Sequence, residues 1–201
     1  MARAPLTFRR LAGLDRSGPP PPQTRRGAPL NPWTVPNAIG FVRLALIPVF
    51  LGVAFSSGYG RDAVAATLFG VIGWGDYADG IAARVTGQYS RLGALLDPVV
   101  DRLLVVSGMA VAWHFHLLPR WLVAVLVARE VAMLVLGRLA LSQGRDIAIN
   151  WPGRLAVAPV MGAPFFAMCG LLGLGTVLLA IGTALALVAT ALYVRDGRTL
   201  K

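Results

Sequence analysis

Six long apolar segments, separated by short polar breaks, follow one another between Asn31 and about Val194. A helix needs about 20 apolar residues to cross the hydrocarbon core of a bilayer, and each segment has about that length. The sequence therefore predicts an all-α integral membrane protein with six transmembrane helices, at 37–57, 63–83, 92–114, 119–141, 152–171 and 173–194.

The composition agrees with a membrane protein. Hydrophobic residues make up 56% of the chain and charged residues 14%, whereas a soluble domain carries nearly twice that share of charge. These proportions exclude a soluble globular enzyme and a disordered protein. The single cysteine, Cys169, excludes an internal disulfide and a cysteine-based metal cluster.

The first 30 residues differ from the rest, because they contain six arginines and a run of four prolines. They have no apolar stretch of the kind found in a secretory signal peptide. This composition predicts a disordered basic tail at 1–30. A six-span domain at 31–201 would follow it.

The cations are distributed unevenly over the predicted loops of this chain, whose net charge is +10. If the N-terminus is inside, both termini and the loops 84–91 and 142–153 collect nearly all of them, and only Arg61 and Arg120 fall outside. The positive-inside rule then predicts a multi-pass protein of the inner (cytoplasmic) membrane with both termini cytoplasmic. Cations between apolar segments predict attraction to anionic membrane lipid and no nucleic-acid partner.

Four of the nine acidic residues lie within 26 positions, where the second predicted span ends and the third begins. Asp76 and Asp79 are spaced i, i+3, and Asp97 and Asp101 are spaced i, i+4, so the members of each pair share a helix face. The loop between the pairs contains Gly87 and can reverse the chain. The two pairs can therefore converge at the cytoplasmic end of a helix hairpin.

Four carboxylates gathered in a poorly solvated site cannot all ionise without compensating cations. Oxygen ligands suit Mg²⁺, Mn²⁺ or Ca²⁺ better than Zn²⁺. A divalent cation at a membrane interface implies an anionic substrate, most simply a phosphate. The alternative is that the acids pair with arginines to pack helices, but charged residues inside spans more often serve function.

The same stretch resembles the CDP-alcohol phosphotransferase family, whose pattern is D-x2-D-G-x2-A-R-x8-G-x3-D-x3-D. Every spacing in the pattern matches. The six-span arrangement extends the resemblance over about 36–196, and the basic tail falls outside it. The eight matching positions are Asp76, Asp79, Gly80, Ala83, Arg84, Gly93, Asp97 and Asp101.

This resemblance implies an enzyme that transfers a phosphatidyl group from CDP-diacylglycerol to an alcohol and releases CMP. It implies that the four aspartates bind two Mg²⁺ or Mn²⁺ ions, and that Asp101 is also the general base. It also implies a homodimer. The residues implied to bind CDP-diacylglycerol are Asn37, Gly80, Ala83, Arg84, Ser90 and Gly93.

Two arginines further along the chain bear on the identity of the acceptor alcohol. Arg129 lies inside the fourth span and Arg154 at the start of the fifth, and a charge inside a span usually faces the interior of the helix bundle. Arg129 could instead pair with Glu130 for packing, although adjacent residues on a helix do not face each other. We expect both arginines to bind the phosphate of a phosphorylated acceptor, such as glycerol 3-phosphate or inositol phosphate.

Longer stretches favour glycerol 3-phosphate, because VPNAIGFVRLALIPVF at 35–50 and SRLGALLDPVVDRLL at 90–104 resemble bacterial phosphatidylglycerophosphate synthases. Where that subgroup commonly has G-K-x-K-T, this chain has Gly153-Arg154-Leu155-Ala156-Val157. That form also resembles actinobacterial cardiolipin synthases, whose acceptor is phosphatidylglycerol, and this alternative stays open. An ion transporter with intramembrane carboxylates is less favoured, because spans one, five and six contain no acids.

Overall fold

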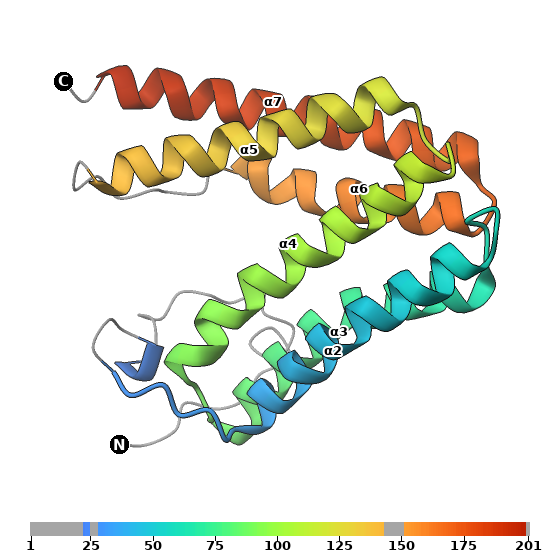
Figure 1. Cartoon of the computed structure of the whole chain (residues 1–201). Helices are drawn as coiled ribbons and strands as arrows, with labels where there is room; N and C mark the ends of the chain where they lie inside the picture. The colour runs from blue at the N-terminus through green and yellow to red at the C-terminus, as the bar shows by residue number, and fades with distance from the viewer. Residues whose placement is uncertain (1–21, 25–27, 143–150, 200–201) are drawn as a thin grey trace. The chain divides into compact units, whose positions relative to one another are not determined.

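The computed structural model describes residues 22–24, 28–142 and 151–199. These residues form a short 3₁₀ helix, η1, and six α-helices (Figure 1), so the predicted all-α class is confirmed for this part of the chain. Each predicted span coincides with one helix to within a few residues. The helices are η1 (Pro22–Thr24), α2 (Val35–Ser56), α3 (Ala63–Thr86), α4 (Arg91–His114), α5 (Arg120–Ser142), α6 (Trp151–Met168) and α7 (Leu172–Thr199).

Within the described residues, two helices are long and apolar enough to cross a membrane, α2 and the part of α7 at Leu172–Arg195. A shorter apolar helix occupies Gly153–Met168. Carboxylates and arginines interrupt the apolar sequences of α3, α4 and α5, which lowers their hydropathy. These helices are consistent with a membrane fold, and the count of six spans remains a prediction.

Polar side chains fix the starts of the first three α-helices. Thr34, Asp62 and Ser90 each precede a helix, and each side-chain oxygen accepts a hydrogen bond from the backbone N–H three residues later, at 3.3, 2.8 and 2.9 Å. Such caps satisfy N–H groups that have no partner within the helix. They explain why the helices begin where the polar breaks end.

Two glycines in a left-handed conformation allow the chain to reverse between helices. Gly87, with φ of 68°, lies in the loop between α3 and α4, and Gly170, with φ of 85°, lies between α6 and α7. Only glycine adopts this conformation without steric cost. The predicted reversal at Gly87 is confirmed, and the chain also turns between the fifth and sixth predicted spans, where α6 ends at Met168 and α7 begins at Leu172.

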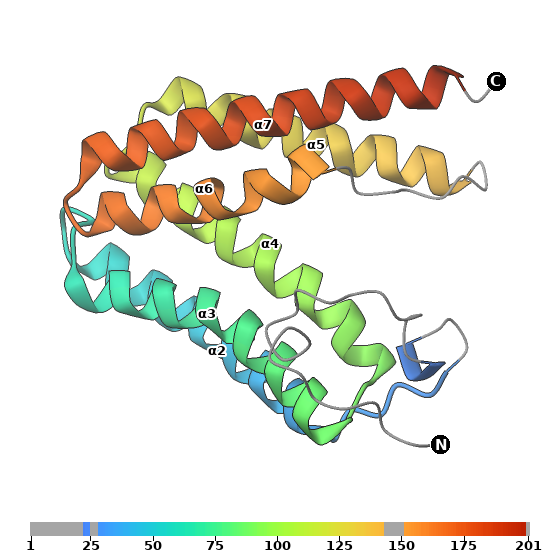
Figure 2. The same ribbon diagram turned by 180° about the vertical axis from the view of Figure 1, so that it is seen from behind.

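The chain forms two compact units, one from Met1–Val53 and Thr67–Ser107 and the other from Ala54–Ala66 and Gly108–Lys201. In the first unit α2 runs beside α3 in both views (Figures 1 and 2). The rings of Phe50 and Phe69 meet edge to face at 5.4 Å between these helices. A Cβ atom on Gly40 would come within 2.8 Å of Leu96, so α2 also approaches α4 closely.

In the second unit α7 packs against both α6 and α5. Glycines on α7 permit the close approach to α6, as small residues do between membrane helices. A Cβ atom on Gly175 would lie 2.8 Å from the carbonyl oxygen of Ala163, and one on Gly182 would lie 2.7 Å from the Val160 side chain. The two helices therefore meet with little side chain between them.

Parts of two predicted segments lie outside the described residues. Of the predicted tail at 1–30, only 22–24 and 28–30 are described, and the carbonyl oxygen of Leu30 accepts a hydrogen bond from the backbone N–H of Leu92 at 3.3 Å. The predicted loop at 142–153 is likewise described only at its two ends. The hydrogen bond between Leu30 and Leu92 shows that the residues just before α2 contact the start of α4.

Candidate active site

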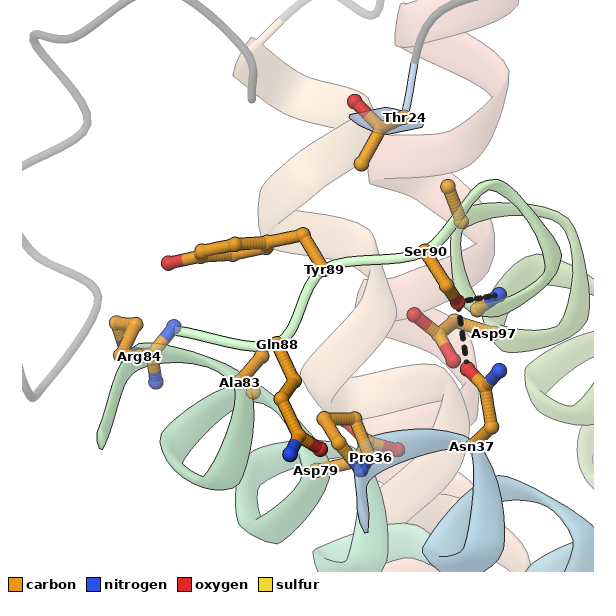
Figure 3. Close-up of a pocket in the computed structure, with 13 residues that line it drawn as sticks. Thr24, Pro36, Asn37, Asp79, Ala83, Arg84, Gln88, Tyr89, Ser90 and Asp97 are labelled. Atoms are coloured by element: carbon orange, nitrogen blue, oxygen red, sulfur yellow. Dashed lines mark hydrogen bonds between the residues drawn. The ribbon is translucent and has the colours of Figure 1, made fainter. Parts of the chain in front are cut away.

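The candidate site lies in the first unit, where the end of α3, the start of α4 and the start of α2 meet. All six residues expected to bind the donor line one cavity there (Figure 3), and Asp79 and Asp97 lie on its wall. The cavity holds about 200 Å³, below the 300–1,000 Å³ of typical ligand pockets. It therefore suits a polar head group rather than a whole lipid. The six residues are Asn37, Gly80, Ala83, Arg84, Ser90 and Gly93.

A buried hydrogen-bond network forms one wall of the cavity. The hydroxyl of Ser90 donates to Oδ1 of Asn37 at 2.8 Å and accepts from the backbone N–H of Gly93 at 2.9 Å (Figure 3). Nδ2 of Asn37 donates to the carbonyl oxygens of Asn31 at 2.9 Å and Pro32 at 3.1 Å. A Cβ atom on Gly93 would lie 2.7 Å from Oδ1 of Asn37, so glycine is required for this contact. The network holds the starts of α2 and α4 together.

Arg84 contributes the cationic group of the cavity. Its guanidinium lies over Gly80, where an added Cβ atom would come within 3.3 Å of Nη1. Gln88 and Tyr89 also line the cavity, and Oε1 of Gln88 accepts a hydrogen bond from the backbone N–H of Val35 at 2.9 Å. Neither Gln88 nor Tyr89 was predicted from the sequence to lie at the site. Both residues lie between the two aspartate pairs in the sequence, and this position could have indicated that they line the site.

The carboxylates gather around Arg43, an arginine that was not predicted from the sequence to lie at the site. Arg43 projects from α2 and is only 2% exposed. Its Nη1 donates to Oδ2 of Asp79 at 2.9 Å, and its Nη2 donates to Oδ1 of Asp101 at 2.6 Å. Oδ1 of Asp76 lies 3.7 Å from Nη1. The structure therefore brings aspartates from both pairs to one buried guanidinium.

The signal for Arg43 was a single charge inside the otherwise apolar segment 37–57. The rule that such charges usually face a polar partner applies to it as much as to Arg129. Its partners lie 36 and 58 residues away in the sequence. No local spacing relates Arg43 to them, and the pairing appears only in the folded chain.

The fit of this site to divalent cations rests on its donor set. Among the described residues, no group of three or more His, Cys, Asp and Glu side chains is placed to hold a metal ion as it stands. However, Asp76, Asp79 and Asp101 all lie within 4 Å of one guanidinium, so the ionised cluster retains an excess of negative charge. Asp79 and Asp97 present hard oxygen ligands to the same cavity, which Mg²⁺ and Mn²⁺ prefer. The donor chemistry therefore fits such ions.

The two arginines expected to bind the acceptor lie in the second unit. Nε of Arg129 donates to the carbonyl oxygen of Ala186 at 3.2 Å and to the hydroxyl of Thr190 at 2.8 Å, which ties α5 to α7. Its Nη1 forms an ion pair with Glu130. The expectation that these adjacent residues would not meet is wrong, because both side chains are long enough to bend along the helix surface. Arg154 lies exposed in the first turn of α6.

A helix hairpin that presents Asp79, Asp97 and Arg84 to one cavity, in a chain with helices apolar enough for a membrane, defines the class of protein. Residues 33–192 match the CDP-alcohol phosphatidyltransferase family model. The chain therefore belongs to this family, whose members are membrane proteins and are generally dependent on divalent metals. The matched region contains the whole aspartate motif and both arginines that were expected to bind the acceptor.

Similar proteins carry two different activity names. A Mycobacterium tuberculosis protein with the provisional name of a cardiolipin synthase is 40% identical over 126 residues, which cover 61% of this chain and 58% of that protein. A Streptomyces coelicolor cardiolipin synthase (CMP-forming) is 36% identical over 134 residues, covering 65% and 62%. A Bacillus subtilis CDP-diacylglycerol–glycerol-3-phosphate 3-phosphatidyltransferase is 31% identical over 135 residues, covering 61% and 70%. The matched part of this chain thus spans less than two thirds of the length of the first two relatives.

Proposed function

We propose that this protein is a phosphatidyltransferase of phospholipid biosynthesis that transfers a phosphatidyl group from CDP-diacylglycerol to an alcohol. One observation carries the proposal: the six expected donor-binding residues share a cavity with Asp79 and Asp97. Membership of the CDP-alcohol phosphatidyltransferase family supports the same reaction.

In the proposed mechanism, Asp76, Asp79, Asp97 and Asp101 would hold two Mg²⁺ or Mn²⁺ ions. Metal ions bound there would supply positive charge that offsets the diphosphate and makes CMP a better leaving group. Arg84 binds a phosphate oxygen of the nucleotide through its guanidinium. The small side chains at Gly80 and Ala83 leave room for the nucleotide in the cavity.

Asp101 accepts the proton of the acceptor hydroxyl as general base. Its Oδ1 is held by Arg43, and its side chain is 36% exposed, so the carboxylate remains accessible. The acceptor oxygen then forms a bond to the phosphorus that carries diacylglycerol, in line with the leaving group. The bond from that phosphorus to the bridging oxygen breaks, and CMP departs with the electron pair.

The site would lie at the cytoplasmic surface of the inner membrane. The positive-inside rule supports six spans with both termini cytoplasmic, and it places the loop between α3 and α4 on the same side. The acyl chains of CDP-diacylglycerol, and those of the acceptor if it is also a lipid, would remain in the bilayer while the head groups enter the cavity. We also propose a homodimer, on family resemblance alone.

For the acceptor we favour phosphatidylglycerol, which would make the product cardiolipin. Two observations support it: the higher identity to the two relatives named as cardiolipin synthases, and the sequence at 153–157. Glycerol 3-phosphate, the acceptor favoured from sequence alone, is the second candidate and is supported by the Bacillus subtilis relative. Both acceptors carry a phosphate for which Arg129 and Arg154 supply positive charge.

The test is a direct assay of lipid products. Purified protein is supplied with CDP-diacylglycerol, Mn²⁺ and either phosphatidylglycerol or glycerol 3-phosphate, and the lipids are identified by mass spectrometry. We expect cardiolipin and CMP from phosphatidylglycerol. Phosphatidylglycerophosphate as the sole product would refute this acceptor and support the second candidate. The absence of both products, with no CMP released, would refute the proposed activity.

A further inference from the structure

Arg43 is held in a slot built for it between α2 and α3. Besides its two carboxylate partners, its Nε donates to the backbone carbonyl oxygen of Ile72 at 2.9 Å. Its aliphatic part passes Gly75, where an added Cβ atom would lie 2.6 Å from Cδ of Arg43 and 2.8 Å from Cγ. All three nitrogens of the guanidinium are therefore engaged, and α3 has a glycine where the side chain needs room.

Arg43 forms a hydrogen bond to one oxygen of each of two carboxylates. Arg43 binds Oδ2 of Asp79 and Oδ1 of Asp101, which leaves the second oxygen of each carboxylate for another cation. Asp79 lines the cavity, whereas Arg43 is not part of its lining. The guanidinium thus contacts Asp79 from the protein interior, and the ligand-binding space lies on another side of that carboxylate.

We propose that Arg43 is a positioning residue for the divalent cations: it fixes Asp79 on α3 and Asp101 on α4 so that their second oxygens can bind metal. The inference rests on the metal-dependent function proposed above. Without a fixed cation, like-charged carboxylates repel one another and lose their common orientation. The planar guanidinium holds both carboxylates and the Ile72 carbonyl oxygen in one fixed geometry, and a compact ammonium group on a flexible stem does not reproduce that geometry. Substitution of a residue that holds a metal ligand in place typically weakens metal affinity 10–100-fold.

The experiment measures Mn²⁺ binding to purified full-length protein, with free Mn²⁺ followed by electron paramagnetic resonance and no lipid substrate present. Arg43→Lys retains the charge but loses the two-pronged geometry, and Arg43→Gln loses both. Gly75→Ala removes no polar group from the protein, but its added methyl group pushes the Arg43 side chain out of its slot. We expect each variant to bind Mn²⁺ 10–100-fold more weakly than the wild type.

Gly52→Ala on α2 is the matched control, because a Cβ atom there meets nothing within 4 Å. Its Mn²⁺ affinity should equal that of the wild type. In an activity assay, the Mn²⁺ concentration for half-maximal turnover of Gly75→Ala should rise in parallel with its Kd. A residue that merely stabilised the fold would not produce this parallel shift.

Three outcomes are distinguishable. Wild-type affinity in both Arg43→Lys and Gly75→Ala would overturn the inference while leaving the proposed function intact. A wild-type protein that binds no Mn²⁺ would overturn the inference together with the metal-dependent function. If the Arg43 variants do not fold, as judged by size-exclusion chromatography, Gly75→Ala decides alone, because an alanine in a helix interior favours the helix.

Discussion

The Asp101→Asn substitution tests the assignment of the general base, and the structure separates its chemical effect from its structural effect. Oδ1 of Asp101 accepts a hydrogen bond from Nη2 of Arg43 at 2.6 Å. Asparagine retains an oxygen that can accept the same bond but removes the negative charge. The difference between an ionic and a neutral acceptor is worth about 1 kcal/mol, so the weaker hydrogen bond to Arg43 should by itself account for less than tenfold. Saturating Mn²⁺ in the assay offsets any loss of metal affinity at the second oxygen of Asp101.

The loss of a general base is larger than this. Proton transfer by a positioned side chain typically contributes about 10²–10⁴-fold to the rate, or roughly 3–5 kcal/mol of activation free energy. We therefore expect turnover by Asp101→Asn to fall by about 10²–10⁴-fold. Binding of CDP-diacylglycerol should change by less than about tenfold, since Asp101 is not among the residues that line the cavity.

The assay follows CMP release at saturating Mn²⁺, CDP-diacylglycerol and acceptor, alongside an equilibrium measurement of donor binding. Asp62→Asn is the control for the same chemical change, because Asp62 caps α3 through the backbone N–H of Ala65 and asparagine caps a helix equally well. Turnover of Asp101→Asn within tenfold of the wild type would refute its assignment as the base. A comparable loss in Asp62→Asn would show that the assay reports folding rather than chemistry.

The remaining predictions concern metal, topology and acceptor. Excess EDTA should abolish CMP release and added Mg²⁺ or Mn²⁺ should restore it, because the cluster has only hard oxygen ligands; full release in EDTA would contradict this. In a Cys169→Ala background, a cysteine at Gln88 should resist an impermeant thiol reagent on intact cells and one at Tyr59 should react; the reverse pattern would overturn the orientation. Arg129→Ala and Arg154→Ala should raise the KM of the acceptor several-fold more than that of the donor, and steady-state kinetics showing the opposite would remove both from the acceptor site.

Much of the local architecture could be predicted from the sequence. Helix ends follow from capping side chains such as Asp62 and Ser90, and the reversal between α3 and α4 follows from Gly87. The donor cavity could be predicted in outline because most of its expected residues lie in one continuous motif. Helical spacing brings the members of such a motif onto common faces, so a local pattern was sufficient.

The contacts between distant segments could not be predicted in the same way. Arg43 stands out only as a charge in an apolar helix, and its pairing with Asp79 and Asp101 depends on how α2 lies against α3 and α4. The engagement of Arg129 with Thr190 on α7 has the same origin. In both cases the sequence indicates that a partner is needed, but tertiary packing determines which residue it is.

The buried position of Arg43 has a consequence for how the protein is made. Arg43 is synthesised 58 residues before Asp101, which is a delay of about 3–12 s at the usual rate of translation. If α2 spans the membrane as proposed, Arg43 therefore reaches the bilayer before Asp101 exists. For the first 36 residues of that interval the arginine has neither Asp79 nor Asp101 as a partner, and afterwards it still lacks Asp101. An arginine without a partner costs roughly 2.5–3.5 kcal/mol in a helix centre. We therefore expect α2 to remain near the insertion machinery until α3 and α4 have emerged. A nascent chain that ends before Asp101 should be held there rather than released into lipid.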